Sequence, residues 1–354
     1  MTADSTVAGI ESVSRLARWL SGNGVPAADR LPSVDLIAGG RSNLTYRLEF
    51  PAPSHPSQLV LRRPPLGHVL PTAHDMTREY RVLSALHGTN IPVARPVAFC
   101  ADADVIGAPF YVMEYVDGLV LRTKEQASLV TPAQARLVSE RLAEMLAAIH
   151  QLDVAAVGLG DFGRPVGYMQ RQLSRWQRQW DLSVSRAVPG YDQLVARLEA
   201  GLPDGGDGTL VHGDFRVDNV LIAAGQEPRI AAVVDWEMST LGDPLADLGL
   251  ALVYWADPQD EEWVDVEVGA TVTAGPGFLT RAEFAASYAA RSGRDLSGIG
   301  YYMAFGCFKL AVVLEGINAR FLQHKTVGEG FDREGKAVPM LIQRAHRMLD
   351  SDPL

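Results

Sequence analysis

Short apolar runs broken by polar and turn residues fill the first third of the chain, and their length is typical of β-strands. The runs are Val34–Ile37, Leu44–Phe50, Leu59–Arg62, Val97–Cys100 and Phe110–Val116. Apolar residues at helical spacing over Val7–Leu20 precede them, and a second helical pattern over His74–Leu86 follows the third run. This part of the sequence therefore predicts a small antiparallel sheet with one helix before it and one helix inserted into it.

Helical periodicity dominates after Gly118, where Thr131-Pro132 has the residue types of a helix N-cap and first turn. Further helical patterns cover Val166–Leu182, Tyr191–Leu202 and the chain from Pro244 onward, and two short strand-like runs lie at Val220–Ile222 and Ile230–Val234. The fold class that follows is α+β. We expect a strand-rich lobe over residues 1–115, a mainly helical lobe over residues 116–354, and a ligand cleft between them.

The composition narrows the class of protein. The 354 residues are 47% hydrophobic and 21% charged, and 42 acidic against 32 basic residues give a net charge of −10. This balance argues against a nucleic-acid binder, which needs a basic face. Two cysteines cannot make a disulfide framework. The N-terminus lacks the pattern of a signal peptide, and the apolar stretch Tyr301–Leu314 is too short to span a bilayer, so a soluble cytoplasmic protein is expected.

The strongest chemical signal is the segment Val211-His-Gly-Asp-Phe-Arg-Val-Asp-Asn-Val220. It places Asp214 and Asn219 in a loop, and Asp235 follows the apolar run Ile230–Val234. Carboxylate and amide oxygens suit Mg²⁺, and one carboxylate is left over to accept a proton from an attacking hydroxyl group. Each piece alone could be a turn or a helix cap. Together, in this order, they match the parts needed for phosphoryl transfer.

These motifs resemble the aminoglycoside phosphotransferase (APH) family, a branch of the protein-kinase-like fold. The resemblance extends over nearly the whole chain and implies a bilobal structure with an antiparallel sheet in the first lobe. It implies that Asp214 is the catalytic base and that Asn219 and Asp235 bind Mg²⁺. Asp-Trp-Glu at Asp235 stands where protein kinases have Asp-Phe-Gly. His212 and Asp247 are expected to support the catalytic loop.

The same resemblance assigns an ATP site to the first lobe. Gly39, Gly40, Ser42 and Asn43 resemble a phosphate loop, because glycines let backbone N–H groups approach phosphate oxygens closely. Arg62 takes the place of the usual lysine, and Glu79 is its expected helix partner. Arg63 should point to the other face of the strand, so Arg62 is preferred.

The segment Phe110–Gly118 resembles the hinge of the kinase fold. Met113 would be the gatekeeper residue, and the backbone of Glu114 and Val116 would bind the adenine edge. A strand that runs into Asp-Gly is also an ordinary strand-to-turn transition, so this assignment depends on its neighbours in the sequence.

The acceptor is the open question. The motifs around Arg62, the hinge and Gly242–Asp247 look most like the branch related to kinase domains fused to acyl-CoA dehydrogenases. The second lobe also carries aromatic residues that belong either to the core or to a pocket, and charged residues that face either solvent or the cleft. They are Tyr168, Arg171, Arg175, Trp176, Arg178, Trp180, Lys309, Glu315 and Arg320.

If those basic residues face the cleft, they favour an anionic acceptor over a polycation. The leading hypothesis is an ATP- and Mg²⁺-dependent kinase of a small hydroxylated metabolite, such as a hydroxyacyl compound. An aminoglycoside or amino-alcohol kinase is the alternative within the same chemistry. A catalytically silent nucleotide-binding module is the alternative of another class. We expect neither a nucleic-acid partner nor a membrane partner, and the sequence leaves the oligomeric state open.

Overall fold

The computed structural model divides the chain into two compact units. The first unit contains Met1–Asp117 and Ala231–Glu237, and the second contains Gly118–Ile230 and Met238–Leu354. The chain thus returns briefly to the first unit, which a single boundary near residue 115 does not describe. The structure describes residues 7–25, 30–37, 43–52, 55–66, 75–184, 186–205, 208–223, 225–260, 271–323, 331–350 and 354.

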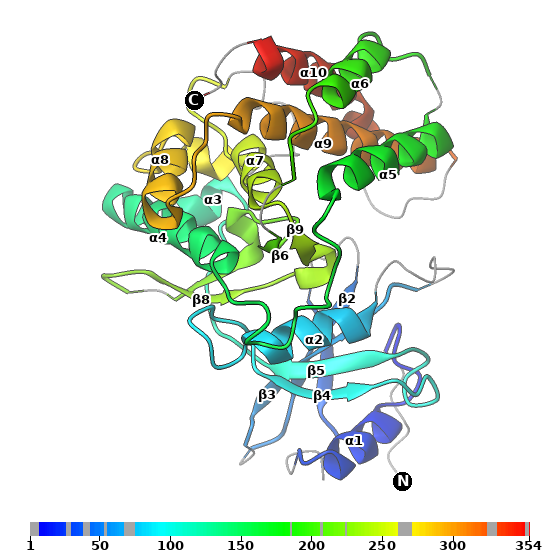
Figure 1. Cartoon of the computed structure of the whole chain (residues 1–354). Coiled ribbons are helices and arrows are strands. Elements are labelled where there is room, and N and C mark those ends of the chain that lie inside the picture. Colours follow the sequence, from blue (N-terminus) through cyan, green and yellow to red (C-terminus); the bar gives the residue numbers. More distant parts are fainter. Residues whose placement is uncertain are drawn as a thin grey trace. The chain divides into compact units, whose positions relative to one another are not determined.

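A five-stranded antiparallel sheet forms the first unit, with the strand order β1-β2-β3-β5-β4 (Figure 1). Its strands are β1 (Ser33–Leu36), β2 (Leu44–Glu49), β3 (Gln58–Arg63), β4 (Pro96–Cys100) and β5 (Phe110–Glu114). All five predicted strands are present. In the register, Arg62 of β3 lies opposite Thr45 of β2 on one side and Tyr111 of β5 on the other.

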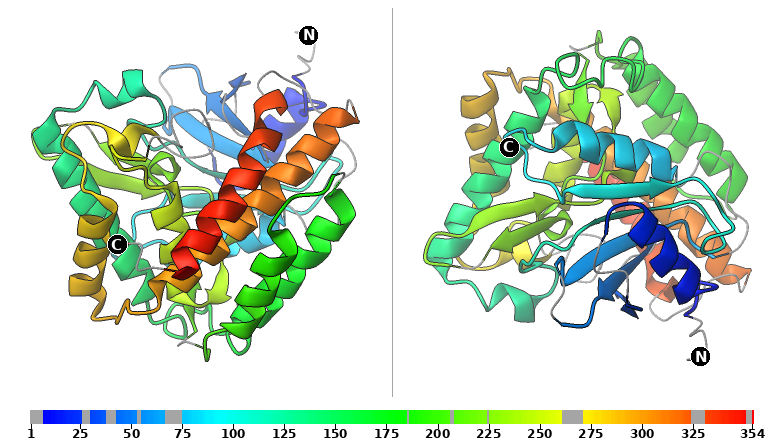
Figure 2. Two further views of the ribbon diagram at one scale, coloured as in Figure 1. Left: turned by 90° about the horizontal axis from the view of Figure 1, so that it is seen from above. Right: turned by 90° about the horizontal axis from the view of Figure 1, so that it is seen from below.

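Two helices cover opposite faces of this sheet, as the right-hand view of Figure 2 shows. Helix α1 (Val13–Gly22) packs its apolar residues on the face that carries Leu59 and Leu61. Helix α2 (Met76–Leu86) lies on the other face, where Glu79 meets Arg62. Because side chains alternate along a strand, this arrangement sends Arg62 toward α2 and the next residue, Arg63, toward the opposite face.

Helix α1 starts later than the apolar period predicts. Val7 and Ile10 form an isolated bridge, and the helix begins only at Val13. The side chain of Ser12 accepts a hydrogen bond from the backbone N–H of Arg15 and caps the helix at this point. A serine cap satisfies one of the free N–H groups of the first turn, and this local bond sets the start of the helix.

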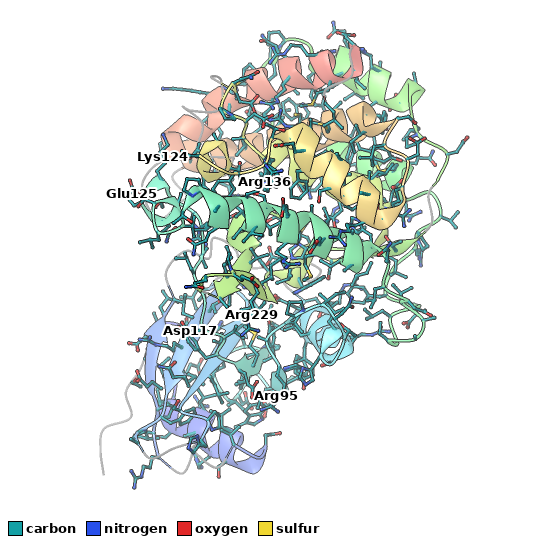
Figure 3. All side chains as sticks on the ribbon, turned by 90° about the vertical axis from the view of Figure 1, so that its left-hand side faces the viewer. Arg95, Asp117, Lys124, Glu125, Arg136 and Arg229 are labelled. Atoms are coloured by element: carbon teal, nitrogen blue, oxygen red, sulfur yellow. The ribbon has the colours of Figure 1, made fainter. Side chains whose placement is uncertain are left out.

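Helices make up most of the second unit. They are α3 (Lys124–Ala127), α4 (Pro132–His150), α5 (Tyr168–Ser183), α6 (Tyr191–Ala200), α7 (Pro244–Tyr254), α8 (Arg281–Ser292), α9 (Ile299–Leu322) and α10 (Phe331–Asp350). Helices α9 and α10 lie side by side, as the left-hand view of Figure 2 shows. Arg136 of α4, labelled in Figure 3, pairs with Glu283 of α8 at 3.6 Å. A sheet in one unit and helices in the other confirm the α+β class.

Helix α9 is longer than the apolar stretch seen in the sequence. Its 24 residues are long and apolar enough to cross a membrane by length and composition alone. In the structure, however, 78% of its most apolar window is buried within the protein. A mostly buried helix of this kind is typical of a helical core.

Short strands frame the loop that holds Asp214. Strand β6 (Thr209–Val211) precedes the loop and pairs with β9 (Thr240–Gly242), and strand β7 (Val220–Ala223) follows it. The chain then passes through β8 (Arg229–Val233) toward Asp235. The sequence predicts β7 and β8, but β6 and β9 have only three residues each, which is too few to show a period of two.

Candidate active site

Arg62 gathers three carboxylates in the first unit. Its Nε donates to Oε2 of Glu79 at 3.0 Å, and its Nη2 donates to Oδ1 of Asp235 and lies 3.6 Å from Oε2 of Glu237. Burial alone would lower the pKa of Arg62, but these carboxylates outweigh it and raise the pKa. The structure therefore brings together Arg62 and Glu79, which were predicted for the nucleotide site, and Asp235, which was predicted to bind Mg²⁺.

Asp235 has an unusual backbone conformation. Its φ is +65°, and no other non-glycine residue among those that the structure describes has a positive φ. A non-glycine residue in the left-handed region is strained, and such strain is concentrated at functional sites. The turn directs the carboxylate of Asp235 to Arg62, where one of its oxygens accepts a hydrogen bond.

The candidate phosphate loop is described only at its end. Gly39, Gly40 and Ser42 lie outside the described residues. Asn43 is buried, and its Nδ2 donates to Oε2 of Glu237 at 2.8 Å. Its side chain thus contacts the segment that follows Asp235, a contact that the sequence does not reveal.

The candidate hinge includes the last residues of β5, which ends at Glu114. Met113 lies opposite Val60 of β3, and the backbone N–H of Glu114 donates to the carbonyl of Arg95 at 2.9 Å. The backbone N–H of Glu114 is therefore already engaged within the first unit. Val116 lies two residues beyond the strand and is half-buried. The roles of these three residues stay predictions.

In the second unit, the loop that carries Asp214 is held from below by one buried acid. The carboxylate of Asp247, on α7, accepts the backbone N–H groups of His212 at 2.6 Å and Gly213 at 2.9 Å. His150 contacts the same carboxylate at 3.2 Å. Burial alone would raise the pKa of Asp247, but these partners lower it. The prediction that Asp247 braces this loop is confirmed.

Gly213 is required where it stands. Its φ is +83°, and a Cβ added there would lie 2.7 Å from the backbone carbonyl oxygen of Met238. Any other residue would force the loop away from Met238. The backbone conformation of Gly213 therefore helps to set the orientation of the next residue, Asp214.

Neutral groups hold the carboxylate of Asp214. Tyr254 donates its hydroxyl to Oδ1 at 2.9 Å, and Asn219 donates its Nδ2 to Oδ2 at 3.1 Å and to the backbone carbonyl of Asp214 at 2.8 Å. Burial raises the pKa of Asp214, and the charges of Arg216 and Lys309 oppose that rise. An acid with a raised pKa and ordered oxygens is suited to accept a proton.

Asn219 also has the right chemistry for a magnesium ligand. Its nitrogen is engaged by Asp214, and the other end of its amide is an oxygen, the atom type that Mg²⁺ prefers. Asp235 supplies a carboxylate oxygen at the end of a strand in the first unit. Among the described residues, no group of three His, Cys, Asp or Glu side chains could hold a metal by itself. An amide oxygen and a carboxylate oxygen are each a type of donor that suits Mg²⁺, whose coordination is usually completed by water and phosphate oxygens.

Among the basic residues considered for the acceptor, Lys309 of α9 is the best candidate to bind substrate. Its ammonium donates to the carbonyl of Gly213 at 2.8 Å and lies 5.6 Å from the ring centre of Trp176 on α5. Burial lowers the pKa of Lys309, and the negative charges of Asp214 and Asp247 counteract that effect. Lys309 is thus held beside the candidate base.

The other residues considered for the acceptor divide into two groups. Trp176 and Trp180 are buried, and Trp180 stacks on Tyr191 with ring centres 4.1 Å apart, so both belong to the core. Glu315 is buried against Arg186 at 2.9 Å. The exposed Arg171 donates to two backbone carbonyls of its own segment. Three more arginines are exposed, and they are Arg175, Arg178 and Arg320.

Tyr254 is the functional candidate that the sequence analysis missed. It lies at the end of α7, seven residues after Asp247. Residues seven apart share one face of a helix, so a helix that places Asp247 below the loop also directs Tyr254 toward it. That spacing was a usable signal.

Comparisons with known proteins identify the family of the chain. Residues 33–283 match the model of the phosphotransferase enzyme family, APH. The chain is 36% identical over 328 residues to acyl-CoA dehydrogenase family member 11 of Rattus norvegicus. This match covers 91% of the chain but only 41% of that relative, so the chain spans less than half of the relative's length.

Solved structures show the same fold. A putative aminoglycoside phosphotransferase from Ralstonia eutropha is 32% identical to this chain, with a TM-score of 0.77. The match covers 95% of this chain and 97% of the other. A thermostable mutant of an aminoglycoside phosphotransferase, in a ternary complex with AMP-PNP and hygromycin B, is 15% identical. Its TM-score is 0.59, with 96% of this chain and 98% of the other covered. The predicted protein-kinase-like fold is confirmed.

Proposed function

Because this chain belongs to the phosphotransferase enzyme family, we propose that it is a kinase that transfers the γ-phosphoryl group of ATP to a hydroxyl group of a small anionic metabolite. The observation that carries the proposal is the environment of Asp214. Its two carboxylate oxygens are held by Tyr254 and Asn219, and its loop is fixed by Asp247. This arrangement supports general-base chemistry without covalent catalysis by the protein.

The proposed reaction uses the residues of each unit for a different task. Asp214 accepts the proton of the acceptor hydroxyl as its oxygen attacks the γ-phosphorus, and the bond from that phosphorus to the ADP oxygen breaks. Arg62, oriented by Glu79, binds phosphate oxygens of the nucleotide. Asn219 and Asp235 would supply oxygen ligands for Mg²⁺, and a bound Mg²⁺ would neutralise charge on the phosphates. Gly39, Gly40, Ser42, Asn43, Met113, Glu114 and Val116 would complete the nucleotide site.

The first experiment replaces the proposed base. Asp214→Asn is expected to keep ATP binding but to lower kcat by about 10²–10⁴-fold, because the amide cannot take the proton. Asp192→Asn, at an exposed position of α6 in the same unit, is the matched control and is expected to keep full activity. A kcat for Asp214→Asn close to that of the control would refute the assignment. Absence of turnover by the unmodified protein with every acceptor would favour the silent nucleotide-binding module.

Lys309 is the basis of the proposed acceptor chemistry. An ammonium group beside the base, bonded to the carbonyl of Gly213, is placed to pair with an anionic group of the acceptor. Buried or half-buried cations need such partners. The likeness to an acyl-CoA dehydrogenase family member supports a hydroxyacyl compound, either as the free acid or as its thioester.

The acceptor is tested by comparison across substrates. We expect turnover of 3-hydroxy acids or their thioesters and little turnover of kanamycin or choline. Lys309→Met is expected to raise KM for the hydroxy acid about tenfold more than for its uncharged alcohol analogue, since only the acid loses a charge partner. Arg178→Met, at an exposed position of α5, is the control. Efficient phosphorylation of kanamycin with no turnover of any hydroxy acid would establish the aminoglycoside alternative instead.

A further inference from the structure

A second candidate site lies in the first unit, on the face of the sheet opposite Arg62. A cavity of about 700 Å³ is formed between the segment before α1, the end of β3 and the loop that joins β4 to β5. Most of its lining residues are of apolar type, although polar atoms contribute almost as much of its surface as apolar atoms do, and its charged members are Arg63 and Glu11. A volume of this size is in the range of small-molecule sites. The apolar wall is made by residues such as Val7, Ile10, Pro65, Leu66, Ile106 and Pro109.

Arg63 differs from the other deeply buried arginines. Arg63, Arg281 and Arg344 are 5%, 7% and 7% exposed. Arg281 pairs with Asp257 at 3.1 Å, and Arg344 pairs with Asp260 at 3.4 Å. Arg63 has no ion pair with any carboxylate of the residues that the structure describes, and it donates instead to backbone carbonyls of Gly9, Pro64 and Ile106.

Part of this guanidinium is left for a ligand. The bonds to the three carbonyls use Nε and Nη1, and Nη2 donates to none of the residues that the structure describes. Nη2 is also not one of the fully buried atoms that lack a partner, so it keeps some solvent exposure, and Arg63 is one of the residues that line the cavity. Burial lowers the pKa of Arg63, and the charge of Glu11, which is itself paired with Arg15 at 3.0 Å, opposes that effect only from a distance. An anion in direct contact with the guanidinium would reduce the remaining cost of burying its charge.

We propose that this cavity binds a small monocarboxylate with a short apolar body, and that its carboxylate pairs with Arg63. The planar guanidinium matches a carboxylate in geometry as well as in charge. The apolar walls suit the hydrocarbon part of such a ligand. Glu11 lines the same cavity and would repel a second negative charge, which disfavours a dianion.

The site is separate from the nucleotide cluster. Arg62 and Arg63 are consecutive residues of β3, and their side chains lie on opposite faces of the sheet. The proposal therefore does not depend on the kinase function, and each can fail without the other.

The test measures binding of hexanoate to the full chain by calorimetry and by the shift in Tm, without nucleotide. Hexanamide is the uncharged analogue, and inorganic phosphate is the anion without an apolar body. Hexanoate is expected to bind at least about tenfold more tightly than either. Equal binding of hexanoate and hexanamide, equal binding of phosphate, or no binding of hexanoate would each overturn the proposal.

Variants then locate the site without touching the carbonyl bonds of Arg63. Leu66 is 58% exposed and lines the cavity, so Leu66→Asp places a repelling charge there and is expected to weaken hexanoate binding about tenfold. Leu36, which is 54% exposed on β1 and outside the cavity, provides the matched control Leu36→Asp, with unchanged binding expected.

The variant Lys309→Met tests whether hexanoate binds at the proposed acceptor site instead of the cavity. Hexanoate affinity is expected to be the same in this variant, because Arg63 belongs to the other unit. Loss of binding in Lys309→Met, or equal effects of Leu66→Asp and Leu36→Asp, would show that hexanoate binds elsewhere and would overturn the proposal.

Discussion

An arginine holds the acids of the first unit, whereas neutral side chains hold the central acid of the second. Around Arg62, the carboxylates of Glu79, Asp235 and Glu237 share one positive charge. Around Asp214, the direct hydrogen-bond donors are the hydroxyl of Tyr254 and the amide of Asn219. The carboxylates of the first cluster therefore contact a charged donor, whereas the carboxylate of Asp214 is hydrogen-bonded to neutral donors.

The difference has a chemical consequence. A guanidinium in direct contact favours the charged form of a carboxylate, although at Glu79 burial outweighs the charge of Arg62 and raises the pKa of that acid. A carboxylate that is partly desolvated and held by neutral donors keeps more affinity for a proton, and the raised pKa of Asp214, caused by burial, agrees with this. The first cluster is suited to charge balance around phosphates and metal, and the second is suited to proton transfer.

The largest effect is expected at Asp235. Asp235→Ala should lose Mg²⁺-dependent ATP binding and activity together, because Arg62 and the metal would both lose this carboxylate. Asp235→Asn distinguishes the loss of the charge from a change in the backbone, since asparagine tolerates the left-handed conformation that alanine does not. Binding of ATP is measured with and without Mg²⁺. Unchanged dependence on Mg²⁺ in both variants would contradict the role of Asp235.

A second prediction tests the support beneath Asp214. Asp247→Asn is expected to lower the free energy of unfolding by about 3 kcal/mol, because one buried oxygen that accepts a hydrogen bond becomes an NH₂ group and leaves a buried donor of the loop without an acceptor. The denaturant midpoint measures this loss, and Asp192→Asn serves again as the exposed control. A midpoint equal to that of the control would mean that the hydrogen bonds from His212 and Gly213 contribute little.

The same variant makes a prediction for pH. The folded-state pKa of Asp247 lies below its ordinary value of 3.8, so its contribution to stability is complete above pH 3.8 and is lost as the pH falls through the folded-state pKa. Asp247→Asn should therefore be less stable than the unmodified protein at neutral pH and should lose less stability on acidification below pH 3.8. Parallel stability profiles for the two proteins would contradict this.

Much of this arrangement could be predicted from the sequence, because the chemistry lies in short motifs. Asp214 and Asn219 stand in one loop, and Asp235 follows the next pair of strands. Arg62 and Glu79 were assigned through the resemblance of their segments to the kinase fold, and the structure places them 3.0 Å apart. The positions of the five strands along the chain in the first unit also followed the apolar pattern.

The features that were not predicted depend on contacts between distant segments. The bond from Asn43 to Glu237 joins positions 194 residues apart, and no local pattern announces it. The later start of α1 depends on the cap at Ser12, and strands β6 and β9 are too short for periodicity. The hydroxyl of Tyr254 reaches Asp214 from a helix that reads as apolar core. Local propensity cannot decide such tertiary contacts.

The smallest expected effect concerns Tyr254, and it is the sharpest test of the contrast between the two clusters. The hydrogen bond from Tyr254 lowers the pKa of Asp214, so Tyr254→Phe should raise that pKa further. A base must be deprotonated to act, and its activity rises with pH through its pKa. The acidic limb of the profile of kcat/KM against pH should therefore move to higher pH, and kcat at neutral pH should fall by less than about tenfold.

Tyr302→Phe is the matched control for this change. Tyr302 donates its hydroxyl to Oδ2 of Asp243 at 2.8 Å, so this variant also removes one tyrosine–aspartate hydrogen bond in the second unit, but the acid involved is the helix cap of α7. It should lower stability while leaving the pH profile in place. If the two variants shifted the profile equally, the effect of Tyr254 would be a general loss of packing. If only Tyr254→Phe shifts it, the neutral donor sets the basicity of Asp214, as the comparison with the arginine-held cluster requires.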